Sequence, residues 1–117
     1  MFKKIATSAI VMMAAAAASA DDLTVYSAGP KPLSAALAEA FTAKTGITVN
    51  LFQSTSGKVM ARYEAEKANP QADVLISASW GHAITLSDAG ELLPYTSPNA
   101  DTVPASLKTE DYVAQGA

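Results

Sequence analysis

A run of small polar residues, Q-S-T-S-G-K at 53–58, stands where a hydrophobic strand pattern gives way to a helical one. Its hydroxyl groups lie at the expected start of a helix, where backbone N–H groups are free and the helix dipole is positive. Such a turn can cradle a small anion, because Thr55 and Ser56 add donors and Gly57 lets the backbone approach closely. An ordinary capping turn, with Ser56 as the N-cap residue, is the alternative interpretation.

Catalytic and nucleotide-binding motifs do not fit this turn. A P-loop requires a glycine where Phe52 stands and a hydroxyl residue where Val59 stands. A serine-hydrolase elbow requires glycines at the positions of Ser54 and Lys58. The only histidine of the sequence is His82, and no pair of carboxylates is placed for acid–base catalysis. We therefore expect a protein that is not an enzyme and has no catalytic residues, metal ligands or cofactor.

Alternating strand and helix patterns predict the elements that position the turn. Strands are predicted at 23–28, 47–52 and 73–78, and helices at about 33–45, 57–68 and 82–89. The order predicts an α/β fold with a parallel β-α-β-α-β sheet, the third strand being fully buried. The apolar stripe of the first helix, which includes Leu33, Leu37 and Phe41, is expected to face the sheet. Residues 111–114 are the expected start of a further strand.

Two local features of the helices are also predicted. Gly46 is expected to end the first helix, as a glycine often does just beyond the last turn. In the second helix, Val59, Met60 and Tyr63 are expected to face inward. Arg62 and Glu66 are four residues apart and are expected to pair on its outer side.

Hydroxyl residues lie at the carboxyl end of each predicted strand. Ligands of parallel α/β sheets bind beyond the carboxyl ends of the strands, so these residues are expected to lie together. Neutral O–H and N–H donors around an oxyanion suit reversible capture of a solute. The residues expected to hold the solute are Ser27, Thr55, Ser56 and Gly57, with Ser79 and Trp80 along the edge of the site.

The first twenty residues have the features of an export signal. Lys3 and Lys4 precede an apolar, alanine-rich stretch, and small residues at 18–20 form a cleavage site before Asp21. The stretch is shorter than the roughly 20 residues that span a bilayer, which argues against a membrane anchor. We therefore expect a signal peptide at 1–20 and a mature periplasmic domain at 21–117.

The composition narrows the class of partner. Loss of the two lysines in the signal changes the formal net charge from −3 to −5, and there is no basic cluster. This balance argues against nucleic acid as the partner. The sequence contains no cysteine, which excludes disulfides and thiolate metal sites.

Four motifs together resemble one family of transport proteins. They are L-T-V-Y-S-A-G-P-K-P at 23–32, T-G-I-T-V at 45–49, S-T-S-G-K at 54–58 and N-P-Q-A-D-V-L-I-S-A at 69–78. The sequence resembles the bacterial extracellular solute-binding proteins of ABC importers, nearest to the ferric-iron-binding and phosphonate-binding periplasmic group with the type 2 periplasmic-binding fold. The resemblance implies the first lobe of a two-lobed clamp, which closes on a solute and delivers it to an ABC permease in the inner membrane.

Two departures from the family pattern qualify the expected solute. Iron-binding members often carry a histidine or tyrosine where this sequence has Pro30, which favours an oxyanion or a phosphorylated compound over ferric iron with a companion anion. The resemblance also implies a second lobe, so residues 21–117 are expected to be an incomplete N-terminal lobe of a monomeric binding protein. The alternatives are a secreted enzyme with catalytic groups in a missing C-terminal part, or an exported protein-interaction domain.

Overall fold

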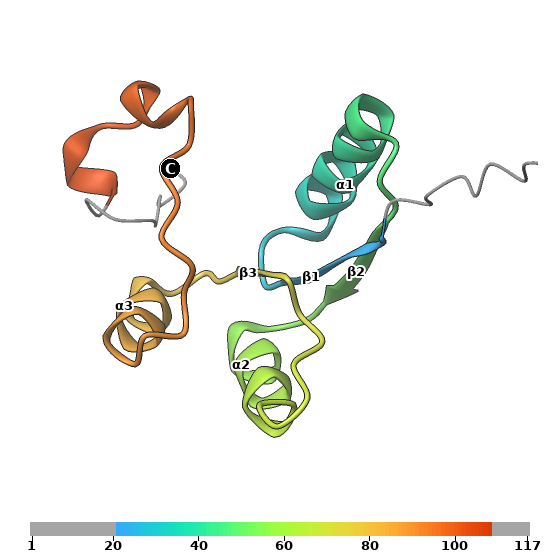
Figure 1. Ribbon diagram of the computed structural model, residues 1–117. Helices are drawn as coiled ribbons and strands as arrows, with labels where there is room; N and C mark the ends of the chain where they lie inside the picture. Colours follow the sequence, from blue (N-terminus) through green and yellow to red (C-terminus); the bar gives the residue numbers. More distant parts are fainter. Residues whose placement is uncertain (1–20, 109–117) are drawn as a thin grey trace, which may run out of the picture.

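The computed structural model describes residues 21–108, so the predicted signal peptide and the strand expected at 111–114 lie outside it. Strands β1 (Leu23–Ser27), β2 (Val49–Gln53) and β3 (Val74–Ile76) form a parallel sheet in the order β2-β1-β3. Helices alternate with the strands along the chain (Figure 1). The predicted α/β class and parallel β-α-β-α-β run are confirmed.

The centre of the sheet is β1, whose residues Val25, Tyr26 and Ser27 are 8%, 1% and 0% exposed. The expectation of a fully buried third strand is wrong. β3 has only three residues and lies at the edge of the sheet, where Val74 is 41% exposed. A strand paired on both sides is shielded by its neighbours, whereas an edge strand is shielded on one side only.

Helix α1 (Lys31–Thr45) ends as predicted but faces the sheet with other residues. Gly46 has φ 75°, and its N–H donates to the carbonyl of Thr42 at 2.8 Å. The buried residue of α1 is Ser34, and the half-buried ones include Ala35 and Ala38. These small side chains allow the helix axis to approach the sheet closely.

The apolar stripe of α1 lies on its outer side, contrary to the sequence-based expectation. Leu33 and Leu37 are each 55% exposed, and Phe41 is 37% exposed. The sequence pattern specified an amphipathic helix, but it did not specify which side would meet the strands.

Helices α2 (Ser56–Ala65) and α3 (Trp80–Asp88) follow β2 and β3. α2 ends earlier than predicted, because the chain continues as turns after Ala65. Figure 1 shows α1 and α2 on opposite sides of the sheet. Right-handed crossovers require this arrangement, since the chain moves from β1 to β2 in one direction and from β2 to β3 in the other.

Each of these two helices buries one apolar side chain. Val59 of α2 is 1% exposed, and Leu86 of α3 is 5% exposed. Met60 and Tyr63, which were expected to face inward with Val59, are half-buried. Beyond α3, short 3-10 helices η1 (Ala100–Thr102) and η2 (Ala105–Leu107) interrupt a proline-containing segment. No helix within residues 21–108 is long and apolar enough to cross a membrane.

Candidate functional site

The carboxyl ends of the three strands lie side by side at one end of the sheet. Ser27 is in register with Gln53 of β2 and with Ile76 of β3. Backbone hydrogen bonds continue this alignment beyond the strands, from Ser54 N to Ser27 O at 3.0 Å and from Ala28 N to Ile76 O at 2.8 Å. The loops that follow the strands are therefore neighbours. In parallel α/β sheets, ligands bind at loops in this position.

The first turn of α2 is capped by Thr55. Its Oγ1 accepts a hydrogen bond from Lys58 N at 3.4 Å, and its carbonyl accepts one from Val59 N at 2.9 Å. The interpretation of Ser56 as the N-cap residue is wrong, because Ser56 is the first residue of the helix itself. Its Oγ accepts a hydrogen bond from Ala78 N at 3.3 Å and so joins the turn to the loop after β3.

These contacts leave donors available at the turn. A hydroxyl that accepts one hydrogen bond can still donate its own hydrogen, which applies to both Thr55 and Ser56. Gly57 borders open space, since a Cβ placed there would meet no atom within 4 Å. The first turn of α2 contains no acidic residue. The turn thus has the donors and the electrostatic sign that an anion requires.

Ser27 is buried in the first loop rather than presented to solvent. It is 0% exposed, and its Oγ is 2.7 Å from Ser34 Oγ and accepts a hydrogen bond from Gly29 N at 3.1 Å. In this structure the hydroxyl shapes the turn between β1 and α1. Its contact with a solute stays a prediction.

Gln53, which is not among the predicted site residues, joins the first two loops. Its Nε2 donates to Gly29 O at 2.6 Å. Its Oε1 is buried and has no hydrogen-bond partner among the described residues. The available signal was its position at the end of a strand, where a side chain can reach the neighbouring loop.

The loop after β3 carries the remaining predicted residues. Ser79 is the exposed N-cap residue of α3, and no side-chain cap hydrogen bond forms there. Ser77 Oγ accepts from Ser79 N at 3.0 Å and lies 2.9 Å from His82 Nδ1. Trp80 is half-buried at the first position of α3, and the first turn of this helix contains no acidic residue. Solute contacts of Ser79 and Trp80 stay predictions.

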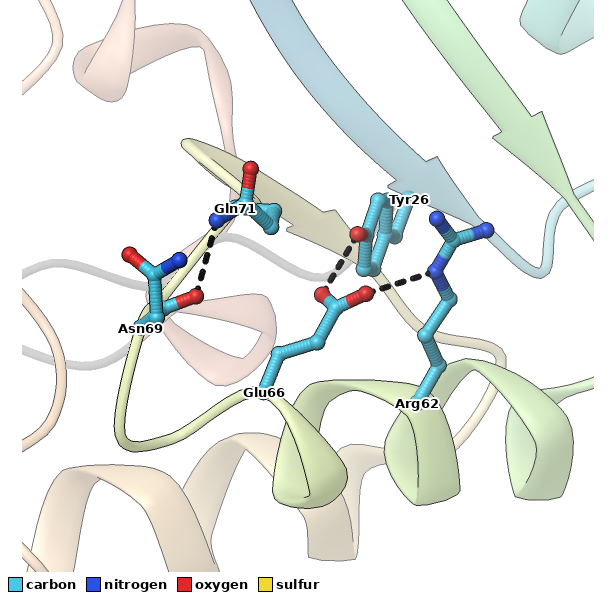
Figure 2. Close-up of polar contacts among 5 residues, drawn as sticks. All are labelled: Tyr26, Arg62, Glu66, Asn69 and Gln71. Carbon is cyan, nitrogen blue, oxygen red and sulfur yellow. Dashed lines mark hydrogen bonds and ion pairs between the residues drawn. The ribbon is translucent and has the colours of Figure 1, made fainter.

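Behind the site, a polar network joins the end of α2 to the sheet (Figure 2). Tyr26 Oη donates to Glu66 Oε2 at 2.6 Å, and Arg62 Nε donates to Glu66 Oε1 at 2.9 Å. The pairing expected between Arg62 and Glu66 is confirmed, but its expected place on the outer side of the helix is wrong, because both side chains contact Tyr26 of the sheet. A separate hydrogen bond, from Gln71 Nε2 to Asn69 O at 2.9 Å, fixes the turn that follows.

The network shifts the pKa values of its members in opposite directions. The hydrogen bond from Tyr26, and then that from Arg62, lower the pKa of Glu66 because they stabilise the carboxylate. Burial is the main cause that raises the pKa of Tyr26, and its hydrogen bond to Glu66 adds to the rise. Both groups therefore keep the donor and acceptor forms that the network needs at neutral pH.

The described residues contain no group of three or more histidine, cysteine or acidic residues that could hold a metal ion. The three loops offer hydroxyl and amide groups instead. Hard cations such as ferric iron favour carboxylate, phenolate or imidazole ligands. Hydroxyl and amide groups of this kind can form hydrogen bonds with an anion or a polar solute.

Comparison with known proteins identifies the family. Residues 23–106, which include all three loops, match the family described as "Bacterial extracellular solute-binding protein". The chain belongs to this family. A probable ABC transporter periplasmic-binding protein of Sinorhizobium fredii is 38% identical over 103 residues, which cover 88% of this chain. The aligned region spans 28% of that relative's length.

Solved structures of solute-binding proteins share the fold. Iron-bound HitA of Pseudomonas aeruginosa matches with a TM-score of 0.70 and 27% identity, over 79% of this chain and 30% of HitA. AfuA of Actinobacillus pleuropneumoniae, with fructose 6-phosphate bound, matches with a TM-score of 0.71 and 28% identity, over 82% of this chain and 30% of AfuA. The chain thus spans less than a third of the relatives it matches.

Proposed function

We propose that the complete protein is the periplasmic solute-binding component of an ABC importer and that residues 21–108 supply one wall of its binding site. Membership of the solute-binding family supports this role. The main structural support is that the three strand ends lie side by side at one end of the sheet. There, a hydrogen bond from Ala78 N to Ser56 Oγ joins the loop after β3 to the first turn of α2. Sites at this end are typical of parallel α/β sheets.

The proposed solute is a small oxyanion or a phosphorylated compound. Two helix N-termini, those of α2 and α3, follow adjoining loops and have no acidic residue in their first turns. Thr55, Ser56 and Gly57 would donate hydrogen bonds to the anionic group, and Ser79 and Trp80 would border it. The match to AfuA, a protein with fructose 6-phosphate bound, is consistent with such a solute.

Ferric iron with a companion anion is the second candidate. The match to iron-bound HitA favours it. Within residues 21–108, however, the loops contribute no cluster of metal-binding side chains, so iron ligands would have to come from other parts of the complete protein. In that case the first turn of α2 would hold the companion anion.

A non-enzymatic role agrees with the family, whose described function is solute binding. Within residues 21–108, the pair Ser77 and His82 is an arrangement suggestive of catalysis, with 2.9 Å between Oγ and Nδ1. A catalytic histidine needs a third group that orients its ring. No acidic side chain is hydrogen-bonded to His82 among the described residues. We propose that this pair shapes the loop, that the protein acts as a monomer and that an ABC permease is its partner.

Titration calorimetry of the complete protein tests the proposal. Inorganic phosphate, a phosphonate, a sugar phosphate and ferric citrate serve as probes. We expect at least one anionic probe to bind, and Ser56→Ala to weaken that binding by about tenfold, since a hydrogen bond to a charged group is lost.

Ser97→Ala is the matched control. Ser97 Oγ accepts a hydrogen bond from Asn99 N in the segment beyond α3, so its loss should leave affinity unchanged. Equal affinities of the wild type and Ser56→Ala would contradict the proposed cradle. Hydrolysis of p-nitrophenyl phosphate that is abolished by His82→Gln would favour an enzyme instead.

A further inference from the structure

Few groups hold α2 against the sheet. Val59 is the only buried residue of this fully described helix. Beyond it, the contacts with the sheet include those of Arg62 within α2 and Glu66 just after it. Their partners are Tyr26 of β1 and Phe52 of β2.

The contacts among these four side chains are close and varied. Glu66 uses both carboxylate oxygens, one for Tyr26 Oη at 2.6 Å and the other for Arg62 Nε at 2.9 Å (Figure 2). The Arg62 guanidinium lies 4.3 Å from the centre of the Phe52 ring and 4.9 Å from that of Tyr26. The two rings meet edge to face at 5.3 Å. A guanidinium placed over the face of an aromatic ring is attracted to it, so these contacts restrict where Arg62 can lie.

The two aromatic residues directly precede the strand ends that form the candidate site. Tyr26 is followed by Ser27, and Phe52 by Gln53. Arg62 is six residues beyond Ser56, or about 9 Å along the helix axis at the usual rise per residue. Since a short helix moves as a unit, a contact that fixes Arg62 over these rings also fixes where the first turn of α2 lies.

We infer that Tyr26, Arg62 and Glu66 are positioning residues for the candidate site, which hold α2 so that its first turn stays beside the loop after β3. None of the three would touch the solute. The inference deepens the proposed function and rests on it for the effect on binding. The placement of the turn itself can be measured without any solute.

The chain supplies a matched control on the same helix. Tyr63 Oη donates to Glu91 Oε2 at 2.6 Å, and Lys67 Nζ lies 2.9 Å from Glu91 Oε1. This second network also consists of a tyrosine, a glutamate and a cation, with lysine in place of arginine, but it joins α2 to the segment after α3 rather than to the sheet. Loss of a cation or of a tyrosine hydroxyl can therefore be compared at two places.

Residue-resolved amide hydrogen exchange of the complete protein tests the placement. The amides of Lys58, Val59 and Ala78 report on the hydrogen bonds made by Thr55 and Ser56. After correction for global stability measured in urea, Arg62→Gln should accelerate exchange at these amides by about tenfold. Lys67→Gln should change it by less than about twofold.

Tyr26→Phe and Tyr63→Phe repeat the comparison with a milder change. Only Tyr26→Phe should accelerate exchange at the three amides. If Arg62→Gln does not fold, the two tyrosine variants still test whether the network positions the first turn of α2. Equal acceleration by both members of either pair, or no change at these amides, would overturn the inference.

Calorimetry with inorganic phosphate and a sugar phosphate supplies the second measurement. Arg62→Gln should weaken binding about threefold or more, and much less so when Ser56→Ala is already present, because a residue that acts through the turn is coupled to it. Additive losses would contradict the inference. If the wild type binds no probe, the proposed function fails, while the exchange data still decide whether the network positions the turn.

Discussion

Two networks of similar composition join α2 to the rest of the protein, one to the sheet and the other to the segment after α3. They differ in how deeply the tyrosine of each network is buried. Each consists of a tyrosine, a glutamate and a cation, with a tyrosine-to-glutamate distance of 2.6 Å and a cation-to-glutamate distance of 2.9 Å. The first contains Tyr26, which is 1% exposed at the centre of the sheet. The second contains Tyr63, which is half-buried on the helix.

The causes of the pKa shifts reflect this difference. Burial is the largest cause that raises the pKa of Tyr26, whereas the hydrogen bond to Glu91 is the largest for Tyr63. The cations Arg62 and Lys67 are equally exposed, at 45% each for the side chain. The ion pairs alone therefore do not distinguish the two networks. The distinguishing features are the buried ring of Tyr26 and the Arg62 guanidinium, which lies over the rings of Tyr26 and Phe52.

The largest expected effect comes from the buried apolar residue of α2. Val59→Ala should lower the free energy of unfolding by about 2 kcal/mol, because it removes two buried methyl groups under α2. Urea denaturation measures this change. A loss as small as that of a substitution at an exposed site, such as Leu93→Ala at a residue that is 84% exposed, would show that α2 is not anchored at Val59.

Removal of the tyrosine hydroxyl should lower the free energy of unfolding more in the first network than in the second. Tyr26→Phe should cost about 1 to 2 kcal/mol, since it leaves a carboxylate oxygen without its buried partner. Tyr63→Phe should cost less than half as much, because water can replace its hydroxyl. Urea denaturation of both variants measures the difference, and equal losses would remove the distinction drawn between the networks.

The acid side of the stability profile should depend on both glutamates. Hydrogen bonds lower the pKa of Glu66 and of Glu91 from the ordinary value of 4.5. A lowered folded-state pKa gives stability that is present above pH 4.5 and is lost as the pH falls through the lowered value. Glu66→Gln and Glu91→Gln should each flatten the dependence of unfolding free energy on pH below 4.5. A profile as steep as that of the wild type would contradict the assigned partners.

The smallest expected effect is that of Lys67, which lies 2.9 Å from both Glu64 and Glu91. Solvent and salt screen such exposed pairs. Lys67→Gln should change the Tm by less than about 2 °C. Thermal unfolding at low salt and in 0.5 M NaCl checks this, and a larger change that persists in salt would show that the second network is as important as the first.

Local sequence signals predicted the elements well where their cause is local. Gly46 ends α1 because the left-handed conformation favours glycine, and Arg62 pairs with Glu66 because residues four apart adjoin on a helix. The sequence also showed hydroxyl residues at the strand ends. Because the strands are parallel, these residues lie at the same end of the sheet. Their contacts with a solute stay predictions.

Other features depended on contacts between distant segments and could not be predicted. The pattern of α1 did not show that Ser34 and Ala38 would meet the sheet while Leu37 stayed exposed, because that depends on how closely the helix approaches the strands. Nor did the hydrophobic third strand reveal its place at the edge, since strand order is set by the crossovers.

The sequence by itself determined the α/β class, the alternation of elements and the polar turn at 53–58, because hydrophobic periodicity and capping chemistry act over a few residues. Only the tertiary structure decided that Thr55 caps α2, that Ser56 binds the backbone of Ala78 and that Ser27 is enclosed in its own loop. Tyr26 and Glu66 are 40 residues apart, and no local pattern records that a buried strand brings one to the other. The physical reason is that hydrogen bonds between segments form only after the sheet has aligned the ends of its strands.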